Sequence, residues 1–170
     1  MIRYTKQRSK YTCGPTVIIN AMKWVGLDAS WNKDIEFCKD ICGMDKDHKG
    51  MWSWAMDEVL KVFPLFKIKK TLHMPKLKEL DAQLDKNRAI VIAYLHRGGK
   101  CQSGHFMLCI GRTDKYYDVV NGTIKGKALS RISRKTMRKR LNVKRIEAGA
   151  LFYPVAWSIE QGLNELKKFF

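Results

Sequence analysis

Apolar positions recur every three to four residues along the first third of the chain, which is the period of an amphipathic helix. The run Val17–Val25 lies between Pro15 and Gly26. Proline favours the first turn of a helix and glycine favours the position just past its end, so this run is predicted to be one helix. Two further helices are expected over residues 32–42 and 51–63.

The period changes after residue 64, where alternating and continuous apolar runs indicate strands. The expected elements are strands over 65–72, 89–95, 105–112, 116–120 and 150–156, and helices over 75–86, over 134–141 with Ser133 as cap, and beyond a capping Ser158. Helices therefore come first and a sheet follows. This order predicts an α+β fold with segregated layers, in a single domain spanning 1–170.

Composition fits a packed globular protein with reduced thiols. The 170 residues are 45% hydrophobic, and we find neither an 18-residue apolar run nor an apolar signal core, so we expect a cytoplasmic protein without a membrane span. An odd number of cysteines indicates free thiols. Their spacing lacks paired C-x2-C motifs, so we expect no metal site, and no cofactor either. The five cysteines are Cys13, Cys38, Cys42, Cys101 and Cys109.

A net charge of +17 favours acidic partners. Ten lysines and arginines lie within Lys125–Arg145, which is more than a solvated face requires. We expect this region to contact an acidic protein or, non-specifically, nucleic acid. High basicity in a small chain is also in keeping with a phage-encoded or bacterial protein. The patch comprises Lys125, Lys127, Arg131, Arg134, Lys135, Arg138, Lys139 and Arg140.

Cys13 is the first candidate for chemistry, because Cys13-Gly14-Pro15 opens the first predicted helix. Unpaired N–H groups at a helix N-terminus carry partial positive charge, which favours the thiolate, the nucleophilic form of cysteine. Gly14 would let a substrate backbone approach closely. The alternative for Cys13 is a small buried apolar side chain, the commonest state of a free cysteine.

A base and its supporting groups can be drawn from the predicted strands. His105 follows Gly104 at the start of one strand and could accept the thiol proton; the alternative is a core histidine with satisfied hydrogen bonds. The next strand offers two residues that could orient the imidazole, Asn121, which we favour, and Asp118. Gln7, six positions before the cysteine, would donate an N–H to an oxyanion.

Three motifs occur in order along the chain: Gln7-x5-Cys13-Gly14-Pro15-Thr16, Gly104-His105-Phe106 and Asn121-Gly122. Together they resemble the papain-like cysteine peptidase superfamily, and within it the bacteriocin-processing (double-glycine leader) peptidase family, in a stand-alone form. The resemblance implies N-terminal helices packed on an antiparallel sheet. It makes Cys13 the nucleophile, His105 the base, Asn121 the orienting residue and Gln7 the oxyanion donor. Gly14, Gly104 and Trp52 are expected to contact the substrate.

Two features depart from that family. Many of its members have Asp where this chain has Asn121, and many are fused to a membrane transporter. We expect a cysteine peptidase or hydrolase that cleaves a peptide, isopeptide or amide bond through a Cys13 thioester, and the resemblance suggests small residues such as Gly before the cut. If another nucleophile resolves the thioester, the same residues make an acyl or peptidyl transferase. The alternative is an inactive basic protein of the same fold that binds nucleic acid or an acidic protein.

Overall fold

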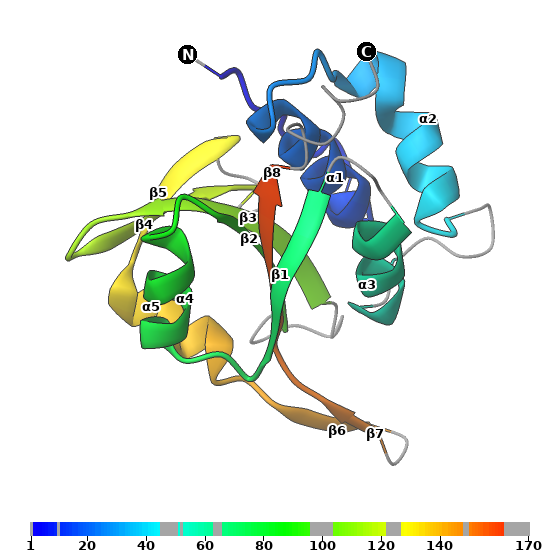
Figure 1. Ribbon diagram of the computed structural model, residues 1–170. Helices are drawn as coiled ribbons and strands as arrows, with labels where there is room; N and C mark the ends of the chain where they lie inside the picture. The colour runs from blue at the N-terminus through cyan, green and yellow to red at the C-terminus, as the bar shows by residue number, and fades with distance from the viewer. Residues whose placement is uncertain are drawn as a thin grey trace.

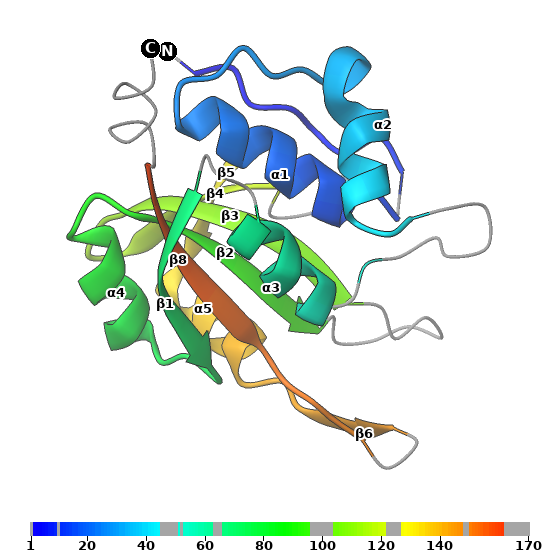
Figure 2. The same cartoon turned by 45° about the vertical axis from the view of Figure 1, so that its right-hand side comes forward.

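Six antiparallel strands form the central sheet, in the order β1-β8-β2-β3-β4-β5 (Figure 1). The computed structural model describes residues 2–9, 11–44, 51, 53–62, 66–95, 104–121, 127–147 and 150–161. The sheet strands are β1 (Phe66–His73), β2 (Ala89–Leu95), β3 (Gly104–Arg112), β4 (Tyr116–Val120), β5 (Leu129–Ser133) and β8 (Val155–Gln161). A separate two-stranded ribbon, β6 (Arg145–Glu147) with β7 (Ala150–Phe152), extends away from the body of the protein (Figure 2).

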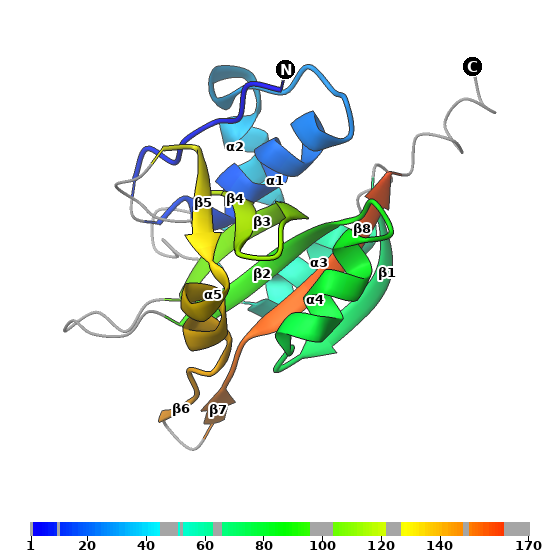
Figure 3. The same cartoon turned by 90° about the vertical axis from the view of Figure 1, so that its left-hand side faces the viewer.

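Helices cover both faces of this sheet. The helices are α1 (Cys13–Trp24), α2 (Trp31–Ile41), α3 (Ser53–Val62), α4 (Leu77–Leu84) and α5 (Arg134–Leu141). The first three lie on one side, and α4 and α5 lie on the other (Figures 1 and 3). The three helices that come first in the sequence thus cover one face of the sheet, and the two later helices cover the opposite face. No helix in the described part of the chain is long and apolar enough to cross a bilayer.

The apolar run of β2 is explained by burial on both faces. Ala89, Val91 and Ala93 pack in the core beneath α1 and α3, whereas Ile90 and Ile92 pack in the second core beneath α4 and α5. A strand with two buried faces needs no polar alternation. The predicted strand over 89–95 is confirmed with the same bounds.

Helix α1 is the most deeply buried helix, with every residue of Cys13–Ala21 in the core. Its buried Asn20 holds the N-terminal segment 2–9: Asn20 Oδ1 accepts from the Thr5 N–H at 2.7 Å, and Asn20 Nδ2 donates to the Thr5 carbonyl at 2.8 Å. One side chain therefore satisfies both backbone groups of Thr5, much as a neighbouring strand would.

The C-terminal part of the chain differs from the prediction. The expected strand over 150–156 is two strands, because β7 ends at Phe152 and β8 begins after Pro154, which has no N–H to donate. The expectation that Ser158 caps a helix is wrong: Ser158 is buried inside β8, which pairs with β1 on one side and β2 on the other. Residues beyond 161 lie outside the described part of the chain.

Asp81 on α4 joins both helices of the second face to the sheet. Its carboxylate accepts two hydrogen bonds from Arg134 of α5, the shorter at 2.6 Å, and one from the Tyr117 hydroxyl of β4 at 2.6 Å. Desolvation raises the pKa of Asp81, but the hydrogen bonds from Arg134 and Tyr117 and the charge of Arg112 outweigh it, so the net pKa lies below its ordinary value of 3.8.

We expect Asp81→Asn to lower the free energy of unfolding at pH 7 by about 2 kcal/mol, the usual scale for a partly buried charged hydrogen bond. The folded-state pKa is lowered, so this stabilisation is present above the unfolded pKa and is lost as the pH falls through the folded one. Urea unfolding between pH 3 and 7 should show wild type and variant converging below about pH 4. A difference that stays constant down to pH 3 would contradict this account.

Candidate active site

Cys13 is the first residue of α1, and its side chain is only 7% exposed. Burial raises the pKa of the Cys13 thiol above its ordinary value, and hydrogen bonds from the backbone N–H groups of Phe106, Gly14 and Cys13 itself offset this only in part. Burial therefore opposes the thiolate that the helix N-terminus was predicted to favour.

The thiol meets β3 at the peptide between His105 and Phe106, since the N–H it accepts from belongs to that peptide. The Phe106 carbonyl accepts a hydrogen bond from Asn121 Nδ2 at 3.2 Å. The N–H and C=O of one residue in a strand point to the same side. Cys13 and Asn121 therefore lie along the same edge of β3, where β4 has ended at Val120 and no longer pairs with it.

His105 is 2% exposed and its Nε2 lies 2.7 Å from the backbone carbonyl oxygen of Asn121. A carbonyl oxygen only accepts, so this contact requires the hydrogen on Nε2 and leaves the lone pair of the neutral ring on Nδ1. The ring also meets Tyr94 of β2 edge to face, with centroids 5.5 Å apart. Tyr94 is directly opposite His105 in the β2–β3 register. Two neighbours thus fix both the tautomer and the plane of the imidazole.

Asn121 acts on His105 through its backbone. It is buried, with a left-handed φ of 59°, a conformation that asparagine tolerates better than most residues. Its N–H donates to the Ala128 carbonyl at 2.8 Å, and its side-chain Oδ1 has no hydrogen-bond partner among the described residues. The sequence predicted an orienting carboxamide; the structure places the backbone carbonyl of the same residue against the ring.

Asp118, the alternative orienting residue, lies elsewhere. It is opposite Gly111 in the register of β3 and β4, and its carboxylate accepts from Arg131 Nε at 2.8 Å. The structure thus brings Asn121 to His105 and leaves Asp118 in a partly exposed ion pair between β4 and β5.

Gln7 is 3% exposed and belongs to the loop that leads into α1. Its Nε2 donates to the Ser9 carbonyl at 2.8 Å, and that carbonyl also accepts from Thr12, the residue before the cysteine, through both N–H and Oγ1. An amide nitrogen has two hydrogens, so one N–H of Gln7 remains for a second acceptor. Its Oε1 has no partner among the described residues.

The glycines predicted to contact the substrate differ in how open their surroundings are. Gly14 is buried, and a Cβ placed on it would lie 2.6 Å from Met51 Sδ, so Met51 fills the space that we expected a substrate to use. Gly104 is exposed at the start of β3. Trp52 lies outside the described residues.

The described members of the predicted basic patch are exposed or partly exposed, and three of them contact neighbouring side chains. Arg131 and Arg134 are held by Asp118 and Asp81, while Arg140 lies over the Tyr94 ring at 4.8 Å and donates to Met107 Sδ. The exposed members are Lys127, Arg131, Lys135, Arg138 and Lys139, and Lys125 lies outside the described residues. Arg140 therefore packs behind the histidine through Tyr94. Sequence reasoning missed Tyr94 as a neighbour of His105. Its contact with the ring follows from the register of β2 and β3, which the sequence alone does not give.

The remaining cysteines are the other candidates for metal ligands. Cys38, Cys42 and Cys109 are buried free thiols, and burial raises the pKa of Cys38 and Cys109 to about 12. Within the described ranges, no cluster of three or more His, Cys, Asp or Glu side chains is arranged to hold a metal ion. Cys101 lies outside them.

Neither a protein-family model nor a curated protein sequence matches the chain. Among solved structures, the chain is similar to the crystal structure of the peptidase domain of Streptococcus ComA, a bi-functional ABC transporter involved in a quorum-sensing pathway. The TM-score is 0.63 at 15% identity, and the alignment covers 95% of this chain and 100% of that one. This likeness confirms the predicted α+β, papain-like peptidase fold.

Replacing Asn121 separates its backbone from its side chain. Asn121→Gly and Asn121→Ala both lose the bond to Phe106, but only alanine is strained at a φ of 59°. We expect the free energy of unfolding of Asn121→Ala to be about 1 kcal/mol lower than that of Asn121→Gly. Chemical denaturation of the two variants measures the difference, and equal stabilities would show that the left-handed conformation carries no cost here.

Proposed function

We propose that this chain is a cysteine peptidase that hydrolyses a peptide bond through a thioester on Cys13. The observation that carries the proposal is the position of the Cys13 thiol against the His105–Phe106 peptide, on the strand edge where Asn121 holds the imidazole. The fold shared with a peptidase domain supports it. The order of Gln7, Cys13, His105 and Asn121 along the chain supports it further.

The first step is attack of sulfur on the substrate carbonyl. Because burial raises the pKa of the Cys13 thiol, His105 is assigned as a general base that takes the thiol proton on Nδ1 while the S–C bond forms. The carbonyl π electrons move to oxygen. The resulting imidazolium stays bound to the Asn121 carbonyl through Nε2–H.

The oxyanion forms beside the N-terminus of α1. Backbone N–H groups there and the second N–H of Gln7 are the donors that would stabilise it. When the tetrahedral intermediate collapses, the C–N bond breaks and His105 returns its proton to the leaving amine. Water then attacks the thioester with His105 again as base, which releases the acid and restores the thiol.

A small residue before the cleaved bond is the substrate feature we propose. Met51 covers Gly14 next to the nucleophile, so the space beside Cys13 is already narrowed by a side chain. The resemblance to peptidases that cut after double glycine leads to the same expectation.

The test is hydrolysis of a fluorogenic peptide amide with Gly-Gly before the cleaved bond, and of an unbiased peptide library. We expect Cys13→Ser and His105→Ala to lower kcat/KM by at least about 1,000-fold, since the pair acts as a unit. Gln7→Ala should lower kcat by about 100-fold, the usual effect of removing one oxyanion donor.

Cys38→Ala serves as the matched control, because Cys38 is a buried thiol on α2 that takes no part in the proposed reaction. Its kcat/KM should equal that of wild type. Folded wild-type protein that cleaves no peptide in the library, or cleavage that survives in Cys13→Ser, would refute the peptidase assignment.

A further inference from the structure

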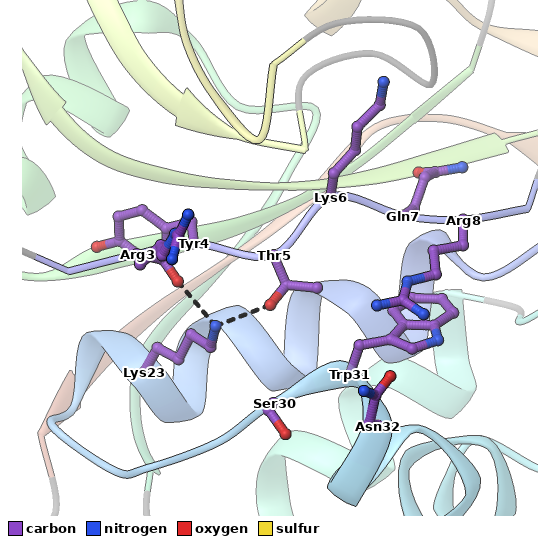
Figure 4. Close-up of a pocket in the computed structure, with 10 residues that line it drawn as sticks. All are labelled: Arg3, Tyr4, Thr5, Lys6, Gln7, Arg8, Lys23, Ser30, Trp31 and Asn32. Atoms are coloured by element: carbon purple, nitrogen blue, oxygen red, sulfur yellow. Dashed lines mark hydrogen bonds between the residues drawn. The ribbon is translucent and has the colours of Figure 1, made fainter.

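A pocket of about 510 Å³ opens between the N-terminal segment and the start of α2 (Figure 4). The segment that forms one wall also carries Gln7, so the pocket adjoins the candidate active site. Its lining residues are Arg3, Tyr4, Thr5, Lys6, Gln7, Arg8, Lys23, Ser30, Trp31 and Asn32.

The lining contains four cations and no carboxylate. The charges of Asp28 and Asp34 act on Lys23, but both carboxylates have partners outside the pocket lining or on its backbone: Asp34 accepts from the Ser30 N–H at 2.6 Å, and Asp28 pairs with Lys33 at 2.9 Å. No lining residue carries a negative charge of its own.

Two of the cations are fixed in position. Lys23 Nζ donates to the Arg3 carbonyl at 2.7 Å and to Thr5 Oγ1 at 2.8 Å, and the Arg8 guanidinium lies 5.2 Å from the centroid of the Trp31 ring. Figure 4 shows these two groups on opposite sides of the pocket. A guanidinium in contact with an aromatic face can still donate its N–H groups to an acceptor.

The charge continues toward the candidate active site. Lys6 extends from the segment away from α2, on the same side as the Gln7 side chain (Figure 4). Asn20 anchors the segment through both backbone groups of Thr5, so the pocket and Gln7 are set on one fixed stretch of chain. From Arg3 to Gln7 that stretch spans at most about 14 Å, the length of four extended residues.

We propose that this pocket is a subsite for an acidic side chain of the peptide substrate, an inference that rests on the proposed peptidase function. A carboxylate matches the guanidinium fork of Arg8 and the ammonium of Lys23. A peptide extends about 3.3 Å per residue, so the acidic residue lies within about four positions of the cleaved bond. The high net charge of the chain then has a local use, which is selection of acidic substrates beside the nucleophile.

The experiment uses blocked Gly-Gly peptides that carry one Glu at each of the four positions on either side of the cleaved bond, each paired with the matching Gln peptide. We expect one Glu position to exceed its Gln partner in kcat/KM by about tenfold, the effect of a charge-assisted hydrogen bond. In Arg8→Gln this preference should fall to about onefold. Lys139→Gln, which removes an exposed charge on α5, should keep the preference.

Binding of the same peptides to Cys13→Ala, measured by calorimetry, separates the pocket from the reaction. If wild type cuts Glu and Gln peptides equally, the pocket proposal is overturned and the peptidase proposal stands. If nothing is cut but the Glu peptide binds in an Arg8-dependent manner, the pocket stands and the peptidase assignment fails. Absence of any Arg8-dependent peptide binding, or tighter Arg8-dependent binding of a mixed-sequence single-stranded DNA, overturns the pocket proposal.

Discussion

The hydrogen bond between His105 Nε2 and the Asn121 carbonyl is the constraint on which the candidate active site depends. It occupies the point where β4 leaves β3, so the strand edge that would otherwise pair with β4 faces the Cys13 thiol and the Asn121 amide instead. The residue that supplies this carbonyl directly follows Val120 and has a left-handed φ of 59°. In the proposed reaction this acceptor fixes which imidazole nitrogen serves as base, and it does so with a backbone atom that no side-chain substitution removes.

Much of the fold could be predicted because most of its elements have a local sequence signal, either an apolar pattern or a residue that favours a helix end. The apolar run of β2 and the Pro–Gly limits of α1 are visible in the sequence and correspond to strands and helices within one or two residues. The exceptions have tertiary causes. The edge strand β5 has no fully buried residue and carries no clear apolar alternation, so it is defined by its pairing with β4. Ser158 fits a helix cap in isolation, but pairing of β8 on both sides places it in the sheet.

The sequence pointed to candidate residues for the site, but it did not indicate their pKa values or their hydrogen-bond partners. Residue types and order pointed to Cys13, His105 and Asn121, which the fold gathers on one edge of β3. The upward shift of the Cys13 pKa could not be inferred, because it follows from how deeply the start of α1 is buried, which the sequence does not show. The carbonyl that holds His105 could not be inferred either, since every residue has one and only the tertiary arrangement of β3 and β4 brings that of Asn121 to the ring. The ion pairs within the basic patch could not be inferred for a similar reason, since the carboxylates that pair with Arg131 and Arg134 come from β4 and α4.

The most direct test of this account is the protonation of the His105 ring in the free protein, measured by long-range ¹H–¹⁵N correlation spectra of uniformly labelled chain at pH 7.5. The account predicts the Nε2–H tautomer, with a hydrogen that exchanges slowly because the ring is 2% exposed and bonded to the Asn121 carbonyl. The same spectrum should be seen in Asn121→Gly, which keeps the carbonyl. An Nδ1–H tautomer, or a ring that averages both forms, would contradict the account, because the nitrogen assigned as the base would then carry the hydrogen.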